Sequence, residues 1–282
     1  MKMLVIIQAR TGSTRLPGKV LLPLGGKPLL QVMLQRVGAA REPMQVMVAT
    51  TTSPQDDVIA ELCDDLAVSC FRGDPTDLLA RHYHAARQWD AEAVVKIPSD
   101  CPLIDPAVID GVLAFYRRHV GFYDYVSNLH PASYPDGNDV EVTSMLALQQ
   151  AYQQARLPME REHTTPYLWD HPERFRIGNV AWETGLDYSL SHRWVIDYPE
   201  DYRLISSLYE ALQPEHGDLF TLQHILDLLR HRPELRRINA RYLGDCWYQK
   251  HLGELRTIDP GRAIPVSRAG TEEREGERYA ER

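Results

Sequence analysis

A loop that carries two glycines and three cations follows the first apolar run of the chain. The apolar run covers residues 3–7, and the loop, residues 8–19, has the sequence QARTGSTRLPGK. Glycine lets the backbone of such a loop come close to a ligand, so that N–H groups surround phosphate oxygens, while arginine and lysine neutralise a polyphosphate. The loop therefore predicts a site for a nucleoside triphosphate. Its candidate residues are Gln8, Ala9, Arg10, Gly12, Ser13, Arg15 and Lys19.

Two familiar phosphate-binding loops do not match this sequence. It lacks the GxGxxG pattern of dinucleotide-binding proteins, which makes a dinucleotide oxidoreductase the least favoured function. Five residues separate Gly12 from Gly18 where a P-loop has four, and Val20 stands where a P-loop has Ser or Thr. Spacing alone therefore leaves a second interpretation open, in which the loop is a surface turn with solvated charges.

Two aspartates stand where a metal ion could be held. Asp100 follows the mainly apolar residues 93–97, and Asp197 follows the apolar residues 194–196. Carboxylates at the ends of strands, together with waters and substrate phosphates, form the oxygen shell that Mg²⁺ prefers. Each aspartate also has a structural alternative: Asp100 as a turn residue before Pro102, and Asp197 as a residue favoured by the dipole of a helix that begins at Pro199.

The composition is that of a globular protein with an excess of acidic residues. The 282 residues include 31 Lys and Arg against 39 Asp and Glu, a net charge of −8, which argues against a general nucleic-acid or anionic-membrane binder. No apolar run approaches the roughly 18 residues of a membrane helix, and no secretory signal is recognisable. The four cysteines form no CxxC pair, which favours free thiols in a reducing compartment. We therefore expect a cytoplasmic protein that binds neither nucleic acid nor membrane.

Short apolar runs alternate with helical patterns in the first 120 residues. Residues 3–7, 46–49, 68–71 and 93–97 predict buried strands. Residues 28–37 and 58–66 predict helices, the second begun by Ser53 and Pro54 with Asp56 reaching back; Asp105 and Pro106 repeat the pattern before a third. The alternation predicts an α/β protein with a Rossmann-like, mainly parallel sheet flanked by helices, and with ligands at the carboxyl ends of the strands.

The rhythm changes between residues 123 and 197. Short β-like pieces at 125–127, 140–143, 175–177 and 194–196 alternate with loops, which we interpret as an inserted β-containing subdomain over the site. Helical patterns return from Pro199 and around Leu222, and they end after Leu255. We therefore predict one domain over residues 1–257. The tail 258–282 is predicted to be disordered, because residues 264–282 are almost without apolar side chains.

A set of motifs in this chain resembles the cytidylyltransferase family that makes CMP-activated sugars. The similarity covers about 200 residues in family order and is greatest to the branch that contains the spore coat polysaccharide biosynthesis protein F. The set is specific, although any single motif would be weak. The motifs are RxGSxRLPGK from Arg10, LGGKPL from Leu24, VATTT from Val48, DD from Asp56, FRG from Phe71, DCPLID from Asp100, PDG from Pro135, DVEV from Asp139, EREHTTP from Glu160 and IDYPED from Ile196.

The resemblance implies a nucleotide-diphospho-sugar transferase type of fold and a Mg²⁺-dependent transfer of CMP from CTP to a sugar or sugar acid, with release of pyrophosphate, in polysaccharide or glycan biosynthesis. It assigns the metal to Asp100 and Asp197, and catalysis to these two acids with Arg10 and Lys19. It also assigns nucleotide contacts to Asp100 and to Thr50 and Thr51, and it suggests a homodimer that forms through residues 123–190. Ser99 and Tyr198 depart from the family pattern, where Gly and Thr are more common. These departures bear on substrate choice and rate more than on the chemistry.

Five further residues are candidates for the sugar site: Asp136, Asn138, Glu141, Arg161 and His163. The first three lie around a Pro-Asp-Gly turn, which would open a strand equally well without a ligand. The last two lie in a charged segment, where a solvated helix face is the alternative.

Two other functions remain open alongside this one. A nucleotide-sugar-dependent glycosyltransferase would need an Asp-x-Asp-like metal motif, which Ser99-Asp100-Cys101 does not supply. A non-catalytic nucleotide-binding protein descended from such an enzyme would be expected to have lost its cations or acids, and this chain has kept them.

Overall fold

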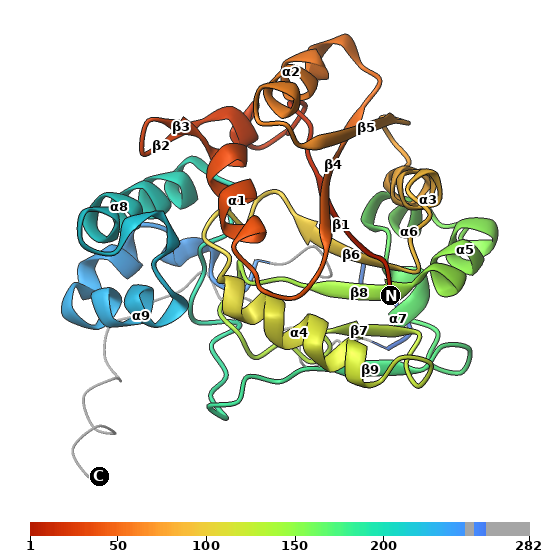
Figure 1. Cartoon of the computed structure of the whole chain (residues 1–282). Coiled ribbons are helices and arrows are strands. Elements are labelled where there is room, and N and C mark those ends of the chain that lie inside the picture. The colour runs from red at the N-terminus through yellow and green to blue at the C-terminus, as the bar shows by residue number, and fades with distance from the viewer. Residues whose placement is uncertain (246–250, 258–282) are drawn as a thin grey trace.

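Four parallel strands form one side of the sheet, from its edge to its middle, in this computed structural model, which describes residues 1–245 and 251–257. In sheet order they are β5 (Ser69–Gly73), β4 (Gln45–Thr51), β1 (Met3–Gln8) and β6 (Ala93–Pro98). Beyond β6 follow the antiparallel β8 (Glu141–Ser144) and then β7 (Tyr125–Ser127) and β9 (Ile177–Asn179). The seven-stranded, mainly parallel sheet with its flanking helices (Figure 1) confirms the predicted Rossmann-like α/β class.

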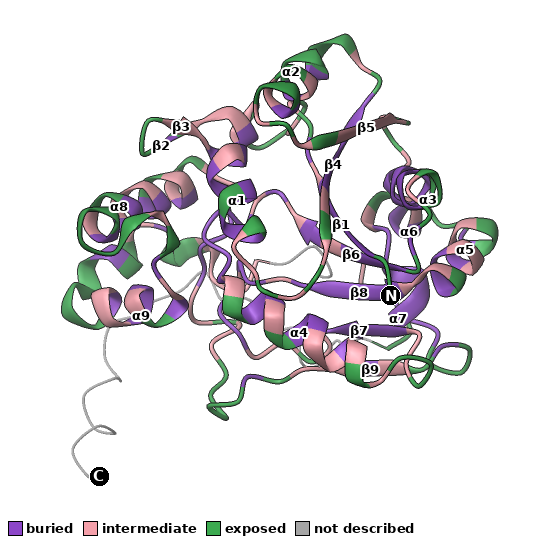
Figure 2. Cartoon of the chain, viewed as in Figure 1, coloured by how far each residue is buried: buried purple, intermediate pink, exposed green. Residues whose placement is uncertain are grey.

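Helices cover both faces of the sheet. One core is packed by α1 (Leu29–Gly38), α2 (Asp57–Asp65), α4 (Pro106–Arg118), α8 (Pro199–His216) and α9 (Leu222–His231). The other is packed by α3 (Leu78–Gln88), α5 (Met145–Gln154), α6 (Pro158–His163) and α7 (Pro166–Trp169). Successive side chains of a strand point to opposite faces, so Val5 and Ile7 enter the first core and Leu4 and Ile6 the second. Because both faces are covered, most residues of β1, β4 and β6 are buried (Figure 2).

Short elements complete the described structure. They are the hairpin β2 (Pro23–Leu24) and β3 (Lys27–Pro28) and the 3₁₀ turns η1 (Lys19–Leu21), η2 (Pro54–Asp56), η3 (Gly217–Leu219), η4 (Pro233–Arg237) and η5 (Ala240–Tyr242). Within residues 1–245 and 251–257, no helix combines the length and the apolar character that a membrane span requires.

The predicted start of the second helix is wrong in one respect. The Asp56 carboxylate does not reach back to Ser53; only the Asp56 N–H bonds to the Ser53 carbonyl, at 3.0 Å, within the turn η2, and α2 begins at Asp57. The Asp56 carboxylate turns instead to the loop that follows β1. The corresponding prediction for Asp105 is confirmed, since its carboxylate accepts the N–H of Ala107 at 2.8 Å and caps α4.

Residues 194–196 do not form the predicted strand. The Trp194 N–H donates to the carbonyl of Asp136 at 3.0 Å, and the Ile196 N–H donates to the carbonyl of Asp100 at 2.8 Å. Because these amides bond to two different loops, no continuous ladder with one neighbour forms. The predicted piece at 175–177 likewise enters the sheet only from Ile177.

Residues 123–197 contribute β7, β8 and β9 to the main sheet, where β8 pairs directly with β6. Their expected part in substrate binding and dimerisation remains a prediction. The tail expected at 258–282 lies outside the described residues.

Candidate active site

Asp56 fixes the loop that follows β1. Its Oδ1 accepts both the backbone N–H and the hydroxyl of Thr11, each at 2.7 Å, and its Oδ2 accepts the hydroxyl of Thr51. Burial alone would raise the pKa of Asp56, but the hydrogen bonds from Thr51 and Thr11 outweigh burial and lower this pKa. Gly18, at φ +68°, donates its N–H to the Thr11 carbonyl at 2.9 Å. The predicted phosphate loop is therefore held in shape by the protein itself.

The first residues of the loop, and two residues near its middle, are also candidates for nucleotide contacts. Gln8 ends β1, and its Oε1 is buried without a hydrogen-bond partner among the described residues. The Ala9 N–H continues the pairing of β1 with β4 by donating to the Ala49 carbonyl at 3.1 Å. Gly12 is exposed, and the Ser13 N–H donates back into the loop. A buried acceptor on Gln8 is a group that a bound base or sugar hydroxyl would satisfy.

Two acids and two cations from distant parts of the sequence meet at the carboxyl end of β6. Lys19 Nζ lies 3.1 Å from Asp100 Oδ2 and 3.1 Å from Asp197 Oδ1. Arg15 Nη2 lies 2.6 Å from the same oxygen of Asp197. The hydrogen bond from Ile196 to the Asp100 carbonyl joins the two loops that carry the acids. Four of the residues predicted from sequence thus form one cluster.

Opposite charges hold this cluster ionised. Burial opposes the charge on Lys19, but Asp100 and Asp197 outweigh it and raise the Lys19 pKa. Burial likewise opposes the charge on Asp197, and Lys19, followed by Arg15, lowers the Asp197 pKa. Asp197 is therefore a carboxylate at neutral pH, the form that binds a hard cation.

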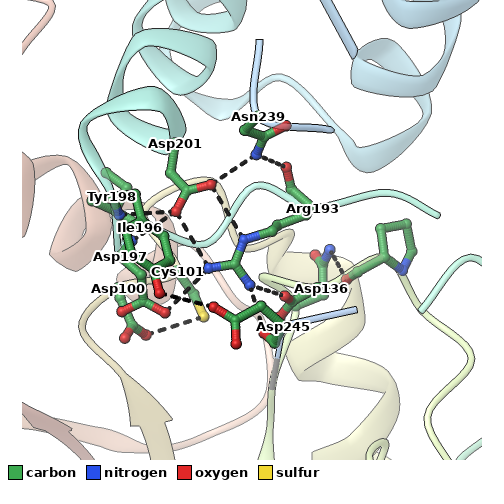
Figure 3. A network of polar contacts seen from close by, with 12 residues as sticks. Asp100, Cys101, Asp136, Arg193, Ile196, Asp197, Tyr198, Asp201, Asn239 and Asp245 are labelled. Carbon is green, nitrogen blue, oxygen red and sulfur yellow. Dashed lines mark hydrogen bonds and ion pairs between the residues drawn. The ribbon is translucent and has the colours of Figure 1, made fainter. Parts of the chain in front are cut away.

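A buried arginine, Arg193, joins Asp197 of this cluster to two further aspartates (Figure 3). Its Nη1 lies 2.8 Å from Asp136 Oδ2, its Nη2 3.1 Å from Asp197 Oδ2, and its Nε 3.2 Å from Asp201 Oδ1. Burial opposes the charge on Arg193, but Asp136 and Asp201 outweigh it and raise the Arg193 pKa. For Asp136 burial prevails over Arg193 and raises the pKa to about 6. One guanidinium thus pairs with three carboxylates, and no motif in the sequence pointed to this arginine.

Asp201 links this network to the chain beyond α9. Its Oδ2 accepts the N–H groups of Asp197 and Tyr198, each at 3.0 Å, which fixes the start of α8. Asn239 Nδ2 donates to Asp201 Oδ1 at 2.8 Å, and the Tyr198 hydroxyl donates to Asp245 Oδ2 at 2.9 Å. Residues 239–245 therefore form part of the wall of the site.

Arg10 lies apart from the four clustered residues, beside a second arginine. Its Nη1 donates to the Pro75 carbonyl at 3.4 Å. Burial, followed by the charge of Arg10, lowers the pKa of Arg81 to about 10. The Arg81 Nε is buried without a hydrogen-bond partner in the described part of the chain. Arg10 and Arg81 are thus near enough for their like charges to repel. Arg81 was not predicted from the sequence; its signal was an arginine among the apolar residues of the buried face of α3.

Two of the predicted sugar residues lie beside a lysine on the α3 side of the sheet. Glu141 pairs with Lys96 of β6 and accepts the Tyr125 hydroxyl at 2.6 Å. Burial would raise the Glu141 pKa, but Lys96 outweighs it and the pKa is lowered. Burial, followed by the charge of Lys96, lowers the pKa of His163 to about 3. Lys96 is a further residue that sequence reasoning missed, and its signal was a single cation within an apolar strand.

Other predicted site residues form hydrogen bonds within the protein or are buried in it. Arg161 Nε donates to Asp77 Oδ2 at 2.9 Å. Asn138 is buried; its Nδ2 donates to the Pro135 carbonyl at 3.2 Å, within the turn before β8, and its Oδ1 accepts the Asp105 N–H at 3.2 Å. Thr50 is fully buried at the end of β4 with its hydroxyl unpartnered among the described residues. The substrate roles of these side chains remain predictions.

Comparison with known proteins decides the family. The family model described as cytidylyltransferase matches residues 4–226. This chain belongs to the cytidylyltransferase family. A solved cytidylyltransferase from Leptospira borgpetersenii serovar Hardjo-bovis is 32% identical, with a TM-score of 0.78, over 83% of this chain and 96% of the other. An uncharacterized protein of Methanocaldococcus jannaschii is 35% identical over 85% of this chain and 95% of its own length. Spore coat polysaccharide biosynthesis protein SpsF of Bacillus subtilis is 29% identical over 82% and 95%.

In this cytidylyltransferase the turn that carries Asp136 packs against Trp194, and a glycine is required there. Gly137 has φ +110°, and a Cβ there would lie 2.8 Å from Trp194 Cδ1 and 3.0 Å from the Trp194 carbonyl oxygen. We expect Gly137→Ala to lower the free energy of unfolding by about 2 kcal/mol or more, because neither the backbone angle nor the carbonyl can adapt without strain. Urea unfolding measures this loss. Gly111→Ala on α4, with open space around it, is the matched control and should be neutral or slightly stabilising; equal effects in the two variants would contradict the prediction.

Buried histidines on the α3 side make the stability of the cytidylyltransferase depend on pH. Burial is the main cause that lowers the pKa of His82 to about 3, of His130 to about 4 and of His163 to about 3. These values lie below the roughly 6.5 of an unfolded histidine, so the unfolded chain takes up protons first as the pH falls. Their contribution to stability is complete above about pH 6.5 and is lost as the pH falls toward the folded values.

We expect His82→Phe to weaken this dependence, because one proton fewer is taken up on unfolding. The slope of the unfolding free energy between pH 6.5 and pH 5 should fall by up to about 1.4 kcal/mol per pH unit. Urea titrations at a series of pH values measure the slope. His84 lies two residues further along α3 and is exposed, so His84→Phe is the control; an unchanged slope in His82→Phe would refute the assignment.

Proposed function

We propose that this cytidylyltransferase transfers CMP from CTP to a sugar or sugar acid in a Mg²⁺-dependent reaction that releases pyrophosphate. The observation that carries the proposal is the convergence of Asp100 and Asp197 on Lys19, with Arg15 beside them. Phosphoryl-type transfer depends mainly on positioning and on neutralising charge, which needs cations and metal-binding carboxylates. An acceptor hydroxyl attacks the α-phosphorus, the bond to the β-phosphate oxygen breaks, the hydroxyl proton is lost to solvent, and pyrophosphate leaves.

The donor set of the acid pair fits a magnesium ion. The carboxylates of Asp100 and Asp197 both come within 3.1 Å of a single atom, Lys19 Nζ, so both face the same point. Two carboxylates, with waters and phosphate oxygens, are a common Mg²⁺ environment. Asp100 and Asp197 would hold the ion, which would neutralise phosphate charge and lower the pKa of the attacking hydroxyl.

The chain's own residues account for the remaining steps. Lys19 and Arg15 would bind the triphosphate and stabilise the charge that develops on the leaving pyrophosphate. Arg10 and Arg81 would add a second cationic contact. The buried hydroxyl of Thr50 and the Gln8 amide would contact the nucleoside.

The acceptor would be bound by residues on both sides of β6. The Lys96 and Glu141 pair, with His163 beside it, would receive hydroxyls of the acceptor. Asp136, held by Arg193, would contribute a carboxylate from the other side of β6. These assignments rest on the proposed reaction.

Calorimetric titration with CTP, ATP, GTP and UTP, each with Mg²⁺ and with EDTA, tests the proposal without knowledge of the acceptor. We expect CTP to bind selectively and more tightly with Mg²⁺. A screen of sugars and sugar acids for pyrophosphate release then identifies the acceptor. Binding of a UDP-sugar with no binding of CTP would favour a glycosyltransferase, and the absence of all nucleotide binding would favour a non-catalytic protein.

We also retain a cytoplasmic location, a role in polysaccharide or glycan assembly and a homodimer as parts of the proposal. Exposed apolar side chains in or beside residues 123–190 support the dimer: Phe122, Leu146, Leu186 and Leu190. Light scattering of the purified protein gives the mass in solution, and a monomer at micromolar concentration would remove this part.

A further inference from the structure

Three oxygens surround the ammonium group of Lys19. Asp100 Oδ2 and Asp197 Oδ1 lie at 3.1 Å, and the carbonyl of Ile196 lies at 2.7 Å. The Lys19 side chain is only 13% exposed, and Arg15 contacts the same Asp197 oxygen. The cluster therefore already contains a cation at the point on which its acids converge.

We propose that Lys19 occupies, in the nucleotide-free protein, the place between Asp100 and Asp197 that a divalent cation takes once CTP is bound. The inference rests on the proposed function, since it assumes that both acids serve as metal ligands. An ammonium group and a metal ion cannot share one position, and at such a distance their like charges repel. Metal binding to the free protein is consequently weak.

The triphosphate is the ligand that releases the acids. Lys19 follows Gly18 in the phosphate loop, and its four-carbon stem lets the ammonium group turn toward a phosphate without movement of the loop. Arg15 belongs to the same loop and gains the same new partner. Once both cations bind phosphate oxygens, the two carboxylates lose their counter-ions and attract a metal.

Metal and nucleotide binding are then coupled, and the coupling is reciprocal. Each ligand must increase the affinity for the other by the same factor, because the two orders of binding form a closed thermodynamic cycle. The device also keeps a pair of ionised acids neutralised while the site has no substrate. It gives Lys19 two successive partners, first the acids and then the triphosphate.

The test uses Mn²⁺ alone as the probe, without nucleotide, and detects free Mn²⁺ by electron paramagnetic resonance. We expect the wild-type protein to bind Mn²⁺ weakly and Lys19→Met to bind it at least about tenfold more tightly, within the usual range of coupling between sites. Arg10→Met is the matched control, because Arg10 belongs to the same loop and carries the same charge, but donates to Pro75 and contacts neither acid. Its Mn²⁺ affinity should change much less. Circular dichroism checks the fold of each variant, and Lys19→Gln replaces Lys19→Met if the latter fails to fold.

Two results would overturn the inference. One is tight binding of Mn²⁺ to the wild-type protein without nucleotide. The other is an equal gain in Lys19→Met and Arg10→Met, which would show a general charge effect rather than competition for one place. Neither result bears on CTP binding by the wild-type protein. Failure of the proposed function would show instead as the absence of CTP binding in calorimetry.

Discussion

Asp197→Asn and Asp100→Asn are each expected to lower the rate of CMP transfer at least about 100-fold. Each change keeps the shape of the side chain and removes one negative charge from the point where both carboxylates meet. The loss corresponds to removing a major electrostatic contribution to a phosphoryl-type transition state. Pyrophosphate release at saturating CTP and acceptor measures the rate.

The two variants should differ in their effect on the fold. Asp197 also bonds Arg193 and Arg15, whereas the ion pair of Asp100 is with Lys19. Asp197→Asn should therefore lower the melting temperature more than Asp100→Asn, although both remain folded. Asp227→Asn, on the exposed face of α9, is the control for a loss of charge elsewhere. Turnover near the wild-type value in either active-site variant would remove that acid from the mechanism.

Most of the sheet could be predicted from the sequence, because its inner parallel strands are short segments of mainly apolar residues. Residues 3–7 and 93–97 are buried on both faces, and such runs carry a clear signal. Helix α3 was missed because Arg81 and His82 stand on its buried face, where an apolar pattern expects other residues. Short α6 and α7 offer too few turns for any period to be read.

The site was predicted in part, and the reason lies in how its residues are held. Loop glycines, Arg15 and Lys19 form a local pattern. Asp100 and Asp197 were found by their positions after apolar segments, and the resemblance favoured a metal-binding role for them over a structural one. Arg193 and Lys96 act through partners far away in the sequence, in the case of Arg193 as far as Asp136, 57 residues away. No local pattern encodes such pairs. Asp56 was assigned to the start of a helix because the pattern of its sequence neighbours, Ser53 and Pro54, is typical of one. Its actual partner, Thr11, lies 45 residues away and could not be read from that pattern.

Arg193→Met is expected to destabilise the protein by about 3–5 kcal/mol, the usual cost of removing one partner from a buried ion pair. The Arg193 side chain is 3% exposed, and Asp201 is fully buried. Without the guanidinium, Asp201 would keep Asn239 and two backbone N–H groups as partners but no cation. Arg230→Met removes an exposed arginine from a surface pair with Asp227 and should change stability by less than about 1 kcal/mol.

The pH dependence of this loss separates an electrostatic cause from a loss of packing. Removing Arg193 raises the pKa of the carboxyl groups around it, above all that of Asp136, which burial already raises to about 6. A folded pKa above the unfolded value means that the variant gains stability relative to the wild type as the pH falls, because protonation removes the unpaired charge. Urea unfolding at pH 7.5 and pH 5 should therefore show a smaller difference between variant and wild type at pH 5. A difference that stays constant with pH would mean that Arg193 serves mainly to fill space, and that the acids of this site do not depend on its charge.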